Sequence, residues 1–108
     1  MKSITTAIGL IALLSVGIVP PCHADDCAKI EELARAIMQK RQENVSIAVM
    51  AATLDKSTES EDARRIFRAM LRDAYGQPAY NTPDFQRRAV DQFANQVYLT
   101  CDKARAKQ

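Results

Sequence analysis

The placement of the three cysteines constrains this chain more than any other feature. Cys22 and Cys27 lie five residues apart near the amino end, whereas Cys101 lies close to the carboxyl end. In an oxidising compartment an even number of cysteines predicts a disulfide framework. The fold therefore depends on whether Cys22 belongs to the working protein, and the segment around it decides that question.

The first 24 residues have the pattern of a secretory signal peptide. Lys2 is the only charge before residues 4–19, an apolar run shorter than the roughly 20 residues of a membrane span. Two prolines end that run, and Cys22-His23-Ala24 then places small residues where a signal peptidase requires them. We therefore expect cleavage after Ala24 and export to a bacterial periplasm or beyond.

Two alternatives for this segment stay open. Cys22 is a candidate for bacterial lipidation, although residues 19–21 lack the small residue that such a site places before its cysteine. The other alternative is an uncleaved amino-terminal anchor. Simple cleavage and lipidation differ in whether the working protein keeps Cys22.

Cleavage after Ala24 leaves residues 25–108, a single domain of 108 − 24 = 84 residues with two cysteines. The simplest pairing is one disulfide between Cys27 and Cys101, which joins the two ends of the domain. Closing so long a loop stabilises a fold by roughly 4 kcal/mol in the chain-entropy account, a large share for a small domain. The alternative is a redox-active pair, but such pairs are usually close in sequence, as in C-x-x-C.

The mature chain has nearly balanced charge and lacks histidine. Removing Lys2 leaves 14 basic and 13 acidic side chains, a net charge of 14 − 13 = +1. This predicts no attraction to nucleic acid, and the chain has no polybasic stretch that would hold it on an anionic membrane. Loss of His23 excludes Ser-His-Asp, Cys-His and histidine-zinc sites, so carboxylates, lysines, tyrosines and hydroxyls are the remaining catalytic groups. No cofactor and no metal-ligand cluster are predicted.

Apolar residues recur at helical spacing along the mature chain, and no strand-like alternation interrupts them. The third segment is the clearest, because its apolar positions from Ala63 to Tyr75 form one helical stripe in which Ile66 is expected to be buried. The shorter second segment is expected to face inward through Ile47 and Leu54. The sequence therefore predicts an all-α bundle of three long helices and one short helix, at residues 26–42, 47–54, 60–75 and 83–104.

Capping residues mark the ends of the predicted helices. The candidates are Asn44 after the first helix, Ser46 before the second and Thr82-Pro83 before the fourth. Thr58 and Glu61 fit a capping box at the start of the third helix. Gly76 is expected to end that helix in the left-handed conformation.

Arginines gather on the predicted third helix and at the start of the fourth. They are Arg64, Arg65, Arg68 and Arg72, followed by Arg87 and Arg88. Arginine forks bind carboxylates and phosphates bidentately, so these arginines predict a site for an anion or an acidic partner. In the alternative they form a solvated face with local pairs, since Glu61 precedes Arg65 by four residues and Asp84 precedes Arg88 by four.

The loop from Tyr75 to Pro83 is the second candidate surface, and Tyr80 is its most informative residue. Two prolines and two tyrosines at a helix junction can form a protein-binding patch, because aromatic anchors dominate the energetics of interfaces. In the alternative, Tyr75 belongs to the core and Tyr80 packs beneath the turn. Arg41, at the end of the first predicted helix, is expected to cap helix carbonyls there.

Short motifs distributed along the mature chain resemble a known group of proteins. The motifs are Cys27, Leu33-Ala34, Ile37-Met38, Arg41-Gln42, Ala74-Tyr75, Pro78 and Phe93…Val97-Tyr98-Leu99…Cys101. The group comprises small secreted bacterial proteins, often associated with phages, of unknown function. The resemblance implies a secreted helical domain with one disulfide, and it implies no activity. A glycine often follows the Arg-Gln pair after one residue in that group, where this chain has Asn44.

These observations predict an exported, non-enzymatic binding module that acts on a protein in the bacterial envelope, such as an inhibitor, an immunity-like factor or an accessory subunit. Tyr80, Arg64, Arg68 and Arg72 are its candidate interaction residues. One alternative is a periplasmic stress chaperone, which would expose apolar helix faces on partial unfolding. Another is a cell-wall enzyme that depends on carboxylates.

Overall fold

The structure is a computed structural model that describes residues 24–107. The predicted signal peptide therefore lies, except for Ala24, outside the described residues. Every regular element from 24 to 107 is a helix: α2 (Ala24–Gln42), α3 (Ile47–Ser57), α4 (Glu61–Tyr75) and α5 (Pro83–Ala106). The predicted all-α fold with three long helices and one short helix is confirmed, and each predicted bound lies within three residues of the observed one.

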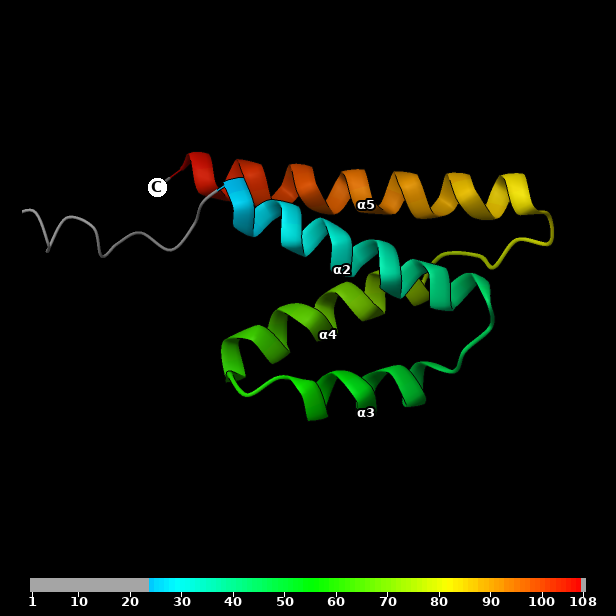
Figure 1. Ribbon diagram of the computed structural model, residues 1–108, viewed down its shortest axis with the longest axis horizontal. Helices are drawn as coiled ribbons and strands as arrows, with labels where there is room; N and C mark the ends of the chain where they lie inside the picture. The colour runs from blue at the N-terminus through cyan, green and yellow to red at the C-terminus, as the bar shows by residue number, and fades with distance from the viewer. Residues whose placement is uncertain (1–23, 108) are drawn as a thin grey trace, which may run out of the picture.

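The helices follow one another across the molecule in the order α5, α2, α4, α3 (Figure 1). α2 and α5 run antiparallel and make the most extensive contact, while α2 also packs on α4, and α3 packs mainly on α4. The core between them holds Ala34, Ile37, Met38, Leu54, Met70, Leu71, Ala74, Val90 and Phe93. The central helix α2 therefore connects the α5 side of the molecule to the α3–α4 pair.

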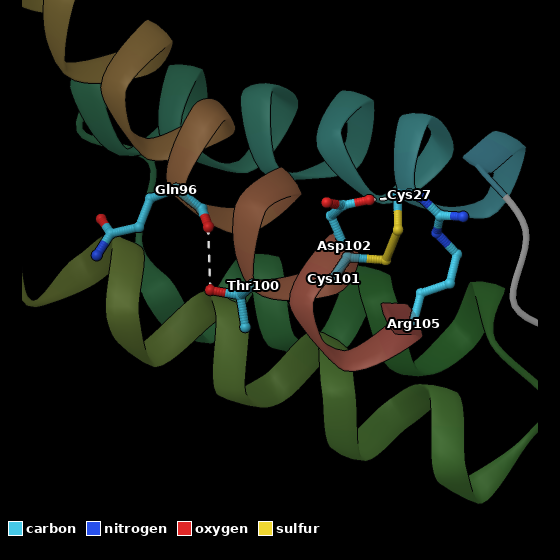
Figure 2. The surroundings of a disulfide bond; sticks show 6 residues. All are labelled: Cys27, Gln96, Thr100, Cys101, Asp102 and Arg105. Carbon is cyan, nitrogen blue, oxygen red and sulfur yellow. Dashed lines mark hydrogen bonds and ion pairs between the residues drawn. A yellow bond between two sulfur atoms is a disulfide. The ribbon is translucent and has the colours of Figure 1, made fainter. Parts of the chain in front are cut away.

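The disulfide between Cys27 and Cys101 fastens the start of α2 to the end of α5, as predicted. The two Cα atoms are 5.6 Å apart, and Cys27 is fully buried. Figure 2 shows the bond beside an ion pair between Asp102 and Arg105 on the last turns of α5. A pairing across 74 residues places both ends of the described chain at one end of the molecule.

Two side chains predicted to be buried are exposed. Ile66 on α4 is 51% exposed, and Ile47 at the start of α3 is 43% exposed. Ile66 borders a groove of about 680 Å³ whose walls include Met70 from α4 and Phe93 from α5. Because α5 packs along α2 rather than along α4, the Ile66 side of α4 is left open. Ile47 is exposed because α3 has only α4 as a main packing partner.

The observed caps confirm some of the predicted helix ends. Ser46 accepts a hydrogen bond from the Val49 amide at 3.2 Å, and Thr82 accepts one from the Phe85 amide at 3.4 Å. Asn44 has a φ of 64°, and the bonds that follow α2 form the pattern of a left-handed helix end. Asn44 thus adopts the conformation for which glycine is the usual residue.

Two predicted caps are wrong. The N-cap of α4 is Ser60, whose hydroxyl accepts from the Ala63 amide at 3.2 Å, whereas Thr58 is the extended residue that ends α3. A capping box from Thr58 is therefore absent, because α4 begins two residues later than the box requires. Gly76 has φ −77° and ψ −11°, which is right-handed, and its amide donates to the Arg72 carbonyl at 3.0 Å. The chain leaves α4 without a left-handed residue.

Candidate functional site

The end of α2 holds the loop between α4 and α5. The Arg41 Nε donates to the Gln77 carbonyl at 2.9 Å, and the Gln42 Nε2 donates to the Pro78 carbonyl at 2.9 Å. The Gln42 Oε1 accepts from the Tyr80 amide at 2.7 Å, and Gln42 is only 5% exposed. Arg41 was predicted to cap helix carbonyls, and its observed acceptor is instead a carbonyl just beyond the end of a different helix, α4. Residues 77–80 are therefore positioned by two side chains that are distant in sequence.

Tyr75, the last residue of α4, binds the loop between α2 and α3. Its hydroxyl donates to the Val45 carbonyl at 2.6 Å, and the Arg41 guanidinium lies 5.3 Å from the centre of its ring. Burial raises the pKa of the Tyr75 hydroxyl, and the positive charge of Arg41 acts in the opposite direction. Tyr75 packs against the core, as one of the two sequence interpretations expected. The loops after α2 and after α4 are thus bound to each other.

Tyr80 is held by its backbone while its ring stays exposed. Besides the bond to Gln42, the Tyr80 carbonyl accepts from the Gln86 Nε2 at 2.8 Å. The ring is 5.8 Å from the ring of Phe85, and the Arg88 guanidinium lies 5.6 Å from the Phe85 ring. Tyr80 is 39% exposed and Phe85 is 52% exposed. We call Tyr80, Phe85 and Arg88 the aromatic cluster.

The sequence predicted Tyr80 as a binding residue of the loop, and it placed Arg88 in the arginine group rather than beside Tyr80. Phe85 was not singled out, and Arg88 was paired with Asp84. In the structure Asp84 pairs with Arg87 at 2.5 Å, which leaves Arg88 beside Phe85. The available signal was the spacing, because a proline-started helix places residue 85 in its first turn, next to the loop that carries Tyr80.

The four arginines of α4 share an open hollow with Asp55 from α3. Arg64, Arg65, Arg68, Arg72, Asp55 and Glu61 line this space of about 520 Å³, which we call the arginine hollow. It has no lining residue in common with the aromatic cluster. The structure therefore brings Arg64, Arg68 and Arg72 together but places Tyr80 on a separate surface.

Local ion pairs occupy part of the arginine hollow. Glu61 pairs with Arg64 at 2.9 Å, and Asp62 pairs with Arg65 at 3.2 Å, so the predicted pair of Glu61 with Arg65 is wrong. These pairs span three residues rather than four. Surface pairs of this kind contribute little to stability.

Arg68 and Arg72 differ in how they are held. Arg68 forms two hydrogen bonds with Asp55, from Nε and from Nη2, and this contact raises the pKa of its guanidinium. Arg72 is exposed, and its guanidinium makes no ion pair with any residue of the described range 24–107. Asp55 therefore orients one arginine across the boundary between α3 and α4, while Arg72 is available to a ligand.

The described part of the chain contains no group of three or more histidine, cysteine, aspartate or glutamate side chains that could hold a metal ion. None of its helices combines the length and the apolar character needed to cross a membrane.

Comparison of the chain with protein-family models, with curated proteins and with solved structures gives no match.

Proposed function

We propose that this protein is an exported, non-enzymatic binding module that acts on a protein partner in the bacterial envelope. The observation that carries the proposal is the aromatic cluster, in which hydrogen bonds on both sides of Tyr80 fix the backbone while the residue remains 39% exposed. Tyrosine and arginine are enriched among the residues that dominate binding energy at interfaces. A surface fixed before binding loses less conformational entropy when the partner docks.

Export is supported by the signal-peptide pattern and by the disulfide. A bond that joins the two ends of a small domain is typical of proteins that fold in an oxidising compartment. We infer that the working protein is residues 25–108 with Cys27 and Cys101 paired. Intact-mass measurement of the exported protein tests this, because cleavage after Ala24 and loss of two hydrogens give a single expected mass, whereas retention of Cys22 with a lipid gives a larger one.

Crosslinking in the native envelope tests the binding function. The full chain is expressed in a bacterium, crosslinked, and recovered with whatever partner it has captured. We expect one reproducible partner protein, and we expect Tyr80→Ala to reduce its recovery by about tenfold or more, as the loss of a dominant interface residue does. Leu99→Ala is the matched control, because Leu99 is an exposed apolar residue on α5 outside the aromatic cluster.

Two results would contradict the proposed function. One is the absence of any reproducible partner. The other is equal recovery from Tyr80→Ala, Leu99→Ala and the unchanged protein, once circular dichroism has shown that all three are folded.

A second candidate function, a periplasmic stress chaperone, is favoured by the position of α3. This helix packs mainly on α4, and Ile47 and Val49 on it are already exposed. Within the described residues, a single ion pair, between Asp55 and Arg68, joins α3 to α4. A chaperone of this design would bind an apolar dye on acid or heat treatment and would suppress aggregation of client proteins, and a protein that does neither is not one.

A further inference from the structure

Three arginines of the arginine hollow form a regular row along α4. Arg64, Arg68 and Arg72 follow one another at intervals of four residues. Four residues of an α-helix rise about 6 Å, so the row presents a guanidinium about every 6 Å over two intervals. Arg65 lies beside the row and lines the same hollow.

The row has unused binding capacity. The lining of the hollow carries four arginines against Asp55 and Glu61, a net charge of 4 − 2 = +2. A guanidinium has five N–H donors, yet Arg64 donates one hydrogen bond to Glu61 and Arg68 donates two to Asp55. The hollow therefore attracts a ligand with several negative charges arranged in a line.

Such a ligand is best supplied by a helix. Carboxylates at positions i, i+4 and i+8 of a helix are also about 6 Å apart along its axis and lie on one face. A helix satisfies its own backbone hydrogen bonds, whereas an extended strand would bring unpaired amides and carbonyls to a surface that offers side chains only. The open hollow between α3 and α4 thus suits a helical partner.

We propose that the arginine hollow binds a helix of the partner protein that carries a stripe of three carboxylates at four-residue spacing. This deepens the proposed function and rests on it, because it names the chemistry of a protein partner. Arg68, which Asp55 orients, is the centre of the row, and Arg72 supplies a guanidinium without an ion pair to the described residues. Association is driven by charge and is accordingly sensitive to salt.

A pair of synthetic peptides tests the spacing. One is an alanine-rich helical peptide with glutamates at i, i+4 and i+8, and the other has the same composition with the three glutamates on different faces. Binding to the mature, disulfide-bonded protein is measured by fluorescence anisotropy. We expect the striped peptide to bind about tenfold more tightly, and to be released when the salt concentration rises from about 0.05 M to about 0.5 M.

Variants of the protein locate the site. Arg72→Gln removes a guanidinium that has no ion pair within residues 24–107, and it is expected to weaken binding of the striped peptide about tenfold without disturbing the fold. Arg87→Gln makes the same charge change on α5, outside the hollow, and is expected to leave binding within about twofold. Arg68→Gln provides a second variant inside the hollow.

The outcomes separate this proposal from the proposed function. Equal binding of both peptides, equal effects of Arg72→Gln and Arg87→Gln, or no binding at millimolar peptide overturns the proposal. Displacement of the peptide by inorganic phosphate at equal concentration would show a general anion site, and it would also overturn the assignment to a helix. If envelope crosslinking still captures a partner through Tyr80 in any of these cases, the proposed function stands and only the identity of the second contact is wrong.

Discussion

Replacement of Gln42 by leucine tests how the loop that carries Tyr80 is held. The Gln42 amide donates to the Pro78 carbonyl at 2.9 Å and accepts from the Tyr80 amide at 2.7 Å, and the side chain is 5% exposed. Leucine has similar bulk and a comparable helix propensity, so the substitution removes these two hydrogen bonds and a weaker one of 3.5 Å from the Gln42 Nε2 to the Met38 sulfur. It leaves one carbonyl and one amide without their partners.

The magnitude of the loss follows from those two groups. A buried polar group that loses its partner costs about 1–3 kcal/mol. Pro78 and Tyr80 lie near solvent, so water can replace part of each bond, and we expect a total loss of about 2–4 kcal/mol in the free energy of unfolding. Small domains are stable by about 5–15 kcal/mol, so the effect is large enough to measure.

The assay is urea unfolding of the mature, disulfide-bonded protein, followed by circular dichroism. Gln39→Leu is the matched control, because Gln39 is exposed and precedes Gln42 by three residues on α2; its expected change is within about 0.5 kcal/mol. If Gln42→Leu is no less stable than Gln39→Leu, the loop is not held in the way described.

Three further predictions concern other parts of the fold. Replacing Cys27 and Cys101 with serine should lower the free energy of unfolding by roughly 4 kcal/mol, measured by urea unfolding, and an equal midpoint with and without the bond would contradict the loop-closure argument. Tyr75→Phe should cost about 1 kcal/mol at neutral pH, through loss of the bond to the Val45 carbonyl. Burial raises the pKa of Tyr75 in the folded state, so the stability contributed by its protonated hydroxyl is fully present below about pH 10 and is lost as pH rises through the folded pKa. Unfolding midpoints measured at neutral and at alkaline pH should therefore show a steeper alkaline loss of stability in the unchanged protein than in Tyr75→Phe. Asn44→Ala should destabilise by about 1 kcal/mol in thermal unfolding, because alanine tolerates the left-handed conformation less well, and Asn44→Gly should change stability by less.

The local parts of the fold could be predicted from the sequence because their signals are local. Apolar spacing identified four helices, and Ser46 and Thr82 were recognised because an N-cap acts within three residues of itself. The cap of α4 was placed two residues early because Thr58 and Ser60 carry the same kind of hydroxyl. Only the path of the backbone decides which of them reaches the free amides.

The contacts between distant segments could not be predicted in this way. A stripe on a helix shows that one face is buried, but not which helix covers it, so Ile66 was assigned to the core although it borders a groove. Gln42 reads as a polar residue at a helix end, yet its bonding partners lie 36 and 38 residues further along the chain. The arginine hollow was predicted in part, because its four arginines share one helix, but the contribution of Asp55 depends on how α3 packs on α4.

The two candidate surfaces differ in how firmly the fold supports them. α5 is fastened to α2 at one end by the disulfide, in the middle by a contact of 2.5 Å between Arg35 and Asp91, and near its start by the loop that Gln42 binds. α3 is joined to α4 by packing and by the pair that Arg68 makes. Recognition by an aromatic anchor requires a fixed geometry, whereas attraction between rows of charge tolerates small displacements. The aromatic cluster therefore lies where the fold is most constrained. A small displacement of α3 would leave binding at the arginine hollow intact, whereas a displacement of the same size at Tyr80 would disrupt binding there.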